Sequence, residues 1–149
     1  MRNILHWAFG YMLVGVASGL FYREFTKLNE FPAGEFTQLS LAHTHLLTLG
    51  FIVLLLVLLL EKAFELSARP RLFGWFFGLY NAGVILTSAM LIVHGMLTVR
   101  GLPSSAMLAG IAGLGHMLLS AGLVLLFVLL RSRVPQRQQP AVTAVRVNG

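Results

Sequence analysis

Histidines are the residues of this sequence whose chemistry and spacing stand out. Each of the five lies in or beside an apolar run: His6, His43, His45, His94 and His116. Ionisable side chains are rare in such runs, because an unpaired polar group in hydrocarbon costs several kcal/mol. Neutral imidazole is the commonest metal ligand, and the sequence contains no Cys and no Asp. Three or four such histidines at one level of the membrane would therefore indicate a shared metal or cofactor.

Three of the histidines are expected at a similar depth. Counted from the expected outer ends of their apolar runs, His45, His94 and His116 lie about four, six and five residues inside. His43 lies just above this level. His6 lies at the opposite end, where its neighbour Trp7 indicates an interfacial pair.

The segment His43-Thr44-His45 limits the kinds of site that can form. Residues two apart on a helix are separated by about 200° around its axis, so both rings cannot easily hold one ion. A heme iron takes axial ligands from opposite faces of the ring, and one His from each of two helices would supply them. A copper site would instead need three rings that converge on one point.

Neighbouring residues suit a flat cofactor but also have simpler roles. Glycines precede His116 at positions 110, 113 and 115, and they would admit either a macrocycle or a neighbouring helix. Arg23 and Arg100 are expected at the outer surface, where they could pair with heme propionates or serve as ordinary interfacial anchors. Tyr80 and Asn81 are expected to form interhelical hydrogen bonds.

The elements that must position these residues are membrane helices. Hydrophobic residues make up 57% of the 149 and charged residues 11%, against about 25% charged in an ordinary soluble domain. Four runs reach the roughly 20 residues that cross a bilayer. We predict an all-α integral membrane four-helix bundle in one domain, residues 1–130, with helices at about 4–26, 38–65, 72–99 and 104–131. The polar remainder, 131–149, is expected to be a disordered cytoplasmic tail.

The net charge of +6 does not indicate nucleic-acid binding, because the basic residues lie at the ends of the apolar runs. Eight of the eleven Lys and Arg residues would share one side of the membrane. The positive-inside rule then places both termini in the cytoplasm. We expect a multi-pass protein of the inner (cytoplasmic) membrane. The acidic residues lie only at helix ends or in links, which argues against a proton-pumping path.

Two resemblances add to this interpretation. The segment Leu41-Ala-His-Thr-His-Leu-Leu-Thr-Leu-Gly-Phe51 resembles the HxH helix of heme–copper oxidase catalytic subunits. That resemblance implies that His43 faces an active or substrate-binding site and that His45 is an axial ligand of a low-spin heme b. The partner of His45 would then be His116, with His94 in reserve. A homotrimer of such chains would reproduce the ring of helices of the oxidase subunit.

The chain as a whole resembles small four-helix bacterial membrane proteins of unknown function. The features that carry this resemblance are Phe21-Tyr-Arg-Glu-Phe-Thr-Lys27, the His-Thr-His segment and Gly113-Leu-Gly-His116.

The leading hypothesis is a heme b-binding membrane protein that acts in electron transfer or in sensing or handling a diatomic gas such as O2 or NO. Its partners would be the lipid bilayer, the heme and a redox partner that the sequence does not identify. One alternative is a copper-binding membrane protein that uses His43, His45, His94 and His116. Another is a non-catalytic assembly or scaffold protein whose histidines only form interhelical hydrogen bonds.

Overall fold

The computed structural model describes residues 1–134 of the chain, and its framework there is helical. Four helices are long and apolar enough to cross a membrane: Arg2–Leu28, Leu39–Phe64, Pro70–Val99 and Ala106–Arg131. They coincide with the four predicted spans. Most of the predicted tail, residues 135–149, lies outside the described residues.

The helices follow one another with short links. Helix α1 covers Arg2–Leu28, α4 covers Pro70–Val99 and α5 covers Ala106–Arg131. The second span has three parts: α2 (Leu39–His45), the π-helix η1 (Leu46–Ile52) and α3 (Val53–Phe64). A 3-10 turn, η2 (Leu66–Ala68), leads from α3 to α4.

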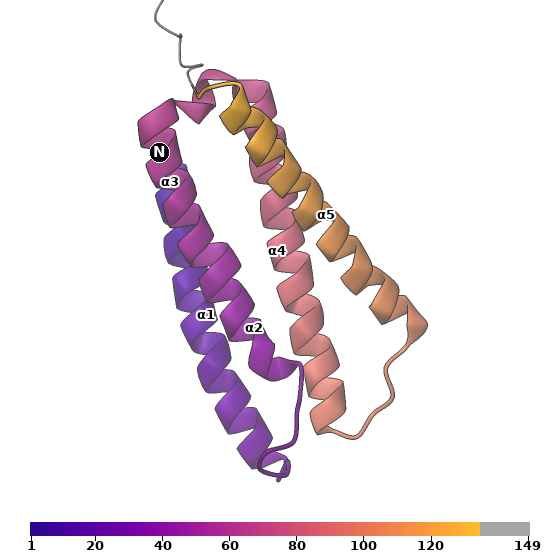
Figure 1. The fold of residues 1–149 in the computed structure, drawn as a ribbon. Helices are drawn as coiled ribbons and strands as arrows, with labels where there is room; N and C mark the ends of the chain where they lie inside the picture. The colour runs from indigo at the N-terminus through magenta and orange to yellow at the C-terminus, as the bar shows by residue number, and fades with distance from the viewer. Residues whose placement is uncertain (135–149) are drawn as a thin grey trace, which may run out of the picture.

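Packing follows the order of the chain. Helix α1 packs along the second span, α2 packs against α4, and α5 packs against α4 (Figure 1). The N-terminus and the end of α5 lie at the same end of the bundle, whereas α4 and α5 diverge toward the loop that joins them (Figure 1).

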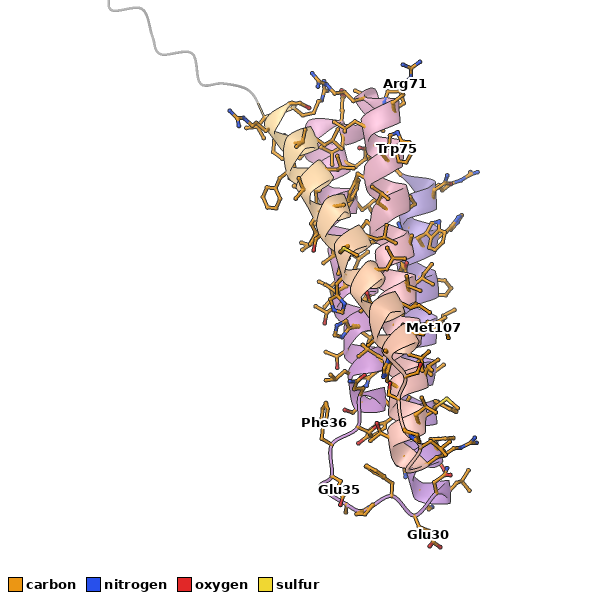
Figure 2. The ribbon with its side chains drawn as sticks, turned by 90° about the vertical axis from the view of Figure 1, so that its right-hand side faces the viewer. Glu30, Glu35, Phe36, Arg71, Trp75 and Met107 are labelled. Carbon is orange, nitrogen blue, oxygen red and sulfur yellow. The ribbon has the colours of Figure 1, made fainter. Side chains whose placement is uncertain are left out.

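The outer surface of the bundle suits a bilayer. Figure 2 shows Arg71 at one end and Glu30 and Glu35 at the other, while Trp75 and Met107 project from the apolar length between them. Both of these apolar side chains are exposed. A surface with charges at its ends and large apolar side chains along its sides is typical of a transmembrane bundle.

Small residues allow α4 and α5 to approach closely. A Cβ atom added to Gly115 would lie 2.7 Å from Oγ1 of Thr87, and one added to Gly122 would lie 2.8 Å from the backbone of Tyr80. By contrast, nothing lies within 4 Å of a Cβ at Gly110 or Gly113. Of the glycines around His116, Gly115 therefore serves helix packing and the other two face open space.

Two tyrosines tie the helices together. The Tyr11 hydroxyl of α1 donates to Oδ1 of Asn81 on α4 at 2.9 Å, and the Tyr80 hydroxyl of α4 donates to the Leu49 carbonyl of η1 at 2.7 Å. The predicted interhelical hydrogen bonds of Tyr80 and Asn81 are thus confirmed, each with a different helix. Because hydrocarbon offers no water to buried polar groups, such bonds favour one relative arrangement of the spans.

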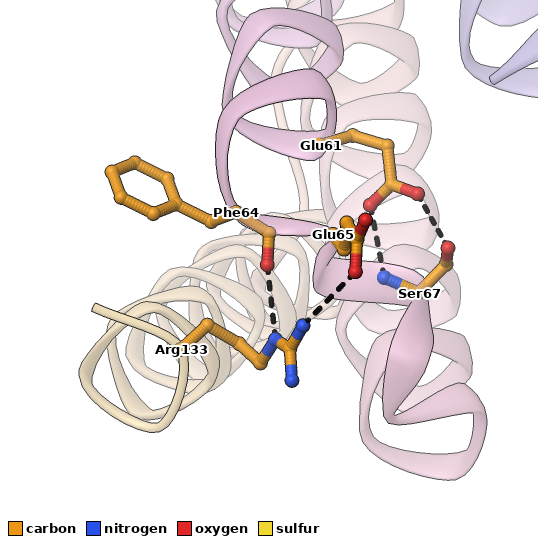
Figure 3. A network of polar contacts seen from close by, with 5 residues as sticks. All are labelled: Glu61, Phe64, Glu65, Ser67 and Arg133. Carbon is orange, nitrogen blue, oxygen red and sulfur yellow. Dashed lines mark hydrogen bonds and ion pairs between the residues drawn. The ribbon is translucent and has the colours of Figure 1, made fainter. Parts of the chain in front are cut away.

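A polar network closes the end of the second span. Glu61, 7% exposed, accepts hydrogen bonds from the Ser67 backbone N–H at 2.9 Å and from the Ser67 hydroxyl (Figure 3). Arg133 follows α5 directly, and its Nε donates to the Phe64 carbonyl at 2.9 Å (Figure 3). The first residues of the segment predicted to be a tail therefore belong to the packed bundle: Arg131 ends α5 and Arg133 caps α3.

Candidate functional site

A pocket of about 270 Å³ lies between α4 and α5. We call it the α4–α5 pocket, and its lining residues are Gln38, Thr87, Met90, Leu91, His94, Ala109, Ala112 and His116. Two of the five histidines of the chain, from adjacent helices, therefore share one hollow.

His94 is held by one ring nitrogen and free at the other. Its Nδ1 lies 3.0 Å from the Ser104 hydroxyl oxygen, in the loop between α4 and α5. Its Nε2 is buried and has no hydrogen-bond partner within residues 1–134. If Nδ1–H donates to Ser104, the lone pair of Nε2 is available to a metal, which is the usual arrangement of a ligating histidine.

His116 also has a hydrogen-bond partner at Nδ1, but it is an exposed residue, whereas His94 is half-buried. The Nδ1 of His116 lies 3.0 Å from the carbonyl oxygen of Ala112, one turn earlier on α5. A carbonyl oxygen can only accept, so Nδ1 carries the proton and Nε2 keeps its lone pair. With its Nδ1 protonated, His116 keeps Nε2 as a lone-pair donor, and His94 does the same if its Nδ1–H donates to Ser104, so both imidazoles are suited to bind a metal centre through Nε2.

Two further side chains of α4 matter to this pocket. Thr87 is 2% exposed, and its Oγ1 has no hydrogen-bond partner in the described part of the chain. Met90 adds a thioether to the lining. The pocket therefore contains two imidazoles, one thioether and one unpaired hydroxyl, and all except the second imidazole come from α4.

The HxH pair lies elsewhere. His45 is absent from the pocket lining, and its Nδ1 lies 3.2 Å from the Leu41 carbonyl. His43 packs on α1 instead: a Cβ added to Gly19 would lie 3.7 Å from the Cβ of His43. The Nδ1 of His43 is buried without a hydrogen-bond partner among the described residues. The structure thus brings His94 and His116 into one pocket, and it does not place His45 there with them.

A three-ligand ion site is not assembled within the described residues. No group of three or more His, Cys, Asp or Glu side chains in residues 1–134 is placed to hold a metal ion. The four histidines named for the copper alternative are therefore divided between the pocket, the α1 contact of His43 and the separate position of His45.

The two arginines expected near heme propionates have other neighbours. Arg23 pairs with the adjacent Glu24 at 3.6 Å, and the guanidinium of Arg100 lies 5.5 Å from the centre of the Phe25 ring. Both arginines are exposed at the end of the bundle where α1 and α4 finish. The contact of Arg100 with Phe25 ties these two helix ends together.

A second, larger hollow was not anticipated from the sequence. It has a volume of about 570 Å³, and we call it the α1–α4 groove. Its lining residues are His6, Trp7, Gly10, Tyr11, Val14, Leu46, Ile85, Ser88, Ala89 and Ile92. The small residues Gly10, Ser88 and Ala89 are the signal that could have located it, because they leave space between two long helices.

Comparison with known proteins identifies the family and assigns no activity. No curated protein and no solved structure matches the chain. The family model described as "Protein of unknown function (DUF2871)" matches residues 1–133, which contain all four membrane-length helices and all five histidines. The chain therefore belongs to this family of unknown function.

Proposed function

We propose that this protein binds heme b in the membrane through His94 and His116 and acts in electron transfer or in sensing or handling O2 or NO. One observation carries the proposal: these two imidazoles, from adjacent helices, line a single pocket. In both, Nδ1 lies 3.0 Å from a hydrogen-bonding partner, which would leave Nε2 to coordinate iron. This pair replaces the pair expected from the oxidase resemblance, His45 with His116.

The size of the pocket sets how a heme would sit. A volume of about 270 Å³ is slightly below the roughly 300–1,000 Å³ of pockets that enclose drug-sized ligands. A porphyrin would be only partly enclosed between α4 and α5, with its outer edge against lipid or a second subunit. Gly110 and Gly113, on the helix that carries His116, border open space that could admit part of the porphyrin. A homotrimer, as the oxidase resemblance implies, would supply a covering subunit.

The proposed location is the inner (cytoplasmic) membrane, with both termini in the cytoplasm. Two observations support this orientation. The N-terminus and the end of α5 lie at the same end of the bundle. The basic residues of the sequence gather at that end, as Arg2, Lys62, Arg71 and Arg133 illustrate. The α4–α5 pocket would then open in the outer half of the bilayer.

The experiment that tests heme binding is an absorption spectrum of protein purified in detergent from heme-replete cells. We expect a b-type Soret band, with heme in stoichiometric amount by extraction. His94→Ala and His116→Ala should each lose or shift this band. His6→Ala is the matched control, because His6 lies outside the pocket, and it should keep the band. Colourless wild-type protein would reject the proposal.

A variant of His45 separates the two candidate ligand pairs. If His94 and His116 hold the heme, His45→Ala keeps the wild-type spectrum. If His45 and His116 hold it, His45→Ala loses the band and His94→Ala keeps it. The spectra of these two variants therefore decide which helix supplies the second ligand.

Copper is the second candidate for the same pocket. The observation that favours it is Met90, because copper(I) prefers imidazole together with thioether ligands. Metal analysis would then give stoichiometric copper without porphyrin, and Met90→Leu would reduce the bound copper. A scaffold protein would contain neither metal, and a variant with Ala at His43, His45 and His116 would fold like the wild type.

A further inference from the structure

We propose that the α1–α4 groove binds a lipid-soluble quinone, whose carbonyl oxygen accepts a hydrogen bond from the Ser88 hydroxyl. The groove, with a volume of about 570 Å³, falls within the range of about 300–1,000 Å³ that is typical of small-molecule sites. Its lining is mostly apolar, which suits a ligand that reaches it from the bilayer.

Ser88 is the residue that points to a ligand. It lines the groove and is 3% exposed, yet its hydroxyl oxygen is buried without a hydrogen-bond partner among residues 1–134. A serine in a membrane helix commonly bonds back to the carbonyl four residues earlier. Thr98 does so on this same helix, with the His94 carbonyl at 3.0 Å. An unpaired hydroxyl in hydrocarbon is costly, so an acceptor on a bound ligand would relieve that cost.

The depth of Ser88 distinguishes a quinone from a phospholipid. At 1.5 Å per residue, Ser88 lies about 27 Å along α4 from Pro70 and about 16 Å from Val99. It is therefore in the hydrocarbon core, which is about 30 Å thick. The ester and phosphate oxygens of a phospholipid remain at the headgroup level. A quinone is apolar overall and can bring a carbonyl acceptor to the middle of the bilayer.

The groove also has room for the chain of such a ligand. Its α1 side runs from His6 to Val14, about 12 Å along the helix. Nothing lies within 4 Å of a Cβ placed on Gly10, which is in the middle of this stretch. The Trp7 ring packs edge-on against Phe77, with ring centres 6.2 Å apart, and so marks the end of the groove away from Ser88. A quinone ring at Ser88 would thus extend its chain past Gly10 toward Trp7.

The groove and the α4–α5 pocket share one helix. Thr87 lines the pocket and the next residue, Ser88, lines the groove. A ligand in the groove would lie about one helix diameter, 10–12 Å, from the pocket. Binding of the quinone does not depend on the proposed heme, and the two can be tested separately.

Trp7 provides the test, because the chain has only two tryptophans and the other, Trp75, does not line the groove. In a Trp75→Phe background, decylubiquinone titrated into the detergent-purified protein should quench Trp7 fluorescence in a saturable way. Gly10→Leu fills the groove and should abolish saturable quenching. Ser88→Ala should weaken the apparent affinity about 2- to 10-fold, as expected for one lost hydrogen bond.

Two matched variants control for general damage. Gly78→Leu adds the same side chain to α4 at an exposed position with nothing within 4 Å, outside the groove lining. Ser120→Ala removes a hydroxyl from an exposed position on α5. Both should titrate like the parent protein. His116→Ala should also keep the quenching even though it loses the heme, so that failure of one proposal is distinguishable from failure of the other.

Three results would overturn the quinone site. Quenching that rises linearly, or that Gly10→Leu leaves unchanged, would show partitioning into the detergent micelle only. Conversion of a wild-type oligomer to monomers by Gly10→Leu would show that a second copy of the chain fills the groove. Brominated phosphatidylcholine is the third probe. If it quenches Trp7 in a way that Gly10→Leu abolishes and decylubiquinone does not reverse, the groove binds an acyl chain instead.

Discussion

The hydroxyl of Tyr80 on α4 donates a 2.7 Å hydrogen bond to the carbonyl oxygen of Leu49, in the middle of the π-helical stretch η1. A π-helix spaces its internal hydrogen bonds differently from an α-helix and is often found at functional positions. The adjacent Gly50 allows the Tyr11 ring to pack directly on the same stretch, because a Cβ there would overlap the ring. Two tyrosines from the flanking helices thus hold η1 in place directly after His45.

Removing the Tyr80 hydroxyl should destabilise the bundle modestly. We expect Tyr80→Phe to lower the free energy of unfolding by about 0.6–1.7 kcal/mol, the range for interhelical hydrogen bonds in membranes. Unfolding in mixed detergent micelles, followed by circular dichroism, would measure it. Tyr22→Phe is the control, because Tyr22 is only half-buried and lies outside η1. Equal stability of Tyr80→Phe and the wild type would show that the Leu49 carbonyl does not need this donor.

The sequence predicted the spans well because the bilayer constrains them strongly. Length and hydropathy place the second helix at about 38–65, and the structure places it at Leu39–Phe64. The same signals say nothing about η1, which contacts Tyr11 and Tyr80, two residues that are distant from it in sequence. The pattern of apolar residues was therefore sufficient for the helices and insufficient for their local geometry.

Crowding the interface between α4 and α5 should disturb both stability and the pocket. In Gly115→Val, the added atoms meet Thr87, whose Oγ1 would lie 2.7 Å from the new Cβ. We expect a loss of about 1–3 kcal/mol, as for other overpacked sites. If the protein binds heme as proposed, this variant should also lose it, because His116 directly follows Gly115 and would shift relative to His94.

Gly113→Val is the matched control for this substitution. It makes the same change two residues earlier, where nothing lies within 4 Å of the new Cβ. It should unfold close to the wild type apart from the small helix-propensity difference. If Gly113→Val destabilised the protein as much as Gly115→Val, the effect would not come from the contact with Thr87.

The depth of each histidine in the membrane could be counted from the sequence, but the direction in which each imidazole ring points could not be predicted. Counting placed His45, His94 and His116 at one level, and the matching depth of His45 and His116 on different helices favoured that pair, with His94 in reserve. Pairing His45 with His116 needs the second span to meet α5, whereas α5 packs on α4. The order in which helices pack is a tertiary property, so His94, the reserve ligand, is the one that shares a pocket with His116.

The loop serine beside His94 should tune the proposed heme site. Ser104→Ala removes the partner 3.0 Å from Nδ1 of His94 and leaves the ring free to rotate. Loss of such a supporting hydrogen bond typically weakens metal affinity about 10- to 100-fold. Heme titration of the apoprotein would measure the affinity, and Ser120→Ala serves as the control. An unchanged affinity and an unchanged spectrum would show that Ser104 does not position the ligand.

The boundary of the C-terminal tail can be tested by truncation. A chain that ends at Val134 keeps Arg133, whose Nε donates to the Phe64 carbonyl at 2.9 Å and whose guanidinium lies 3.4 Å from the Glu65 carboxylate (Figure 3). A chain that ends at Leu130 loses both contacts. Because a cation near the last carbonyls of a helix is favourable, the shorter chain should be less stable by about 1 kcal/mol.

Most of the difference in stability between the two truncated chains should come from the hydrogen bond of Arg133 to Phe64. The ion pair of Arg133 with Glu65 is largely exposed, and such pairs contribute little. Arg133→Ala in the chain ending at Val134 should reproduce the loss, whereas Glu65→Gln should leave stability almost unchanged. Detergent unfolding of these chains would measure the effects. If the two truncated chains were equally stable, residues 131–134 would behave as the dispensable tail that the sequence predicts. A lower stability of the shorter chain would instead show that the bundle extends to Arg133, since this side chain then joins the end of α5 to the end of α3.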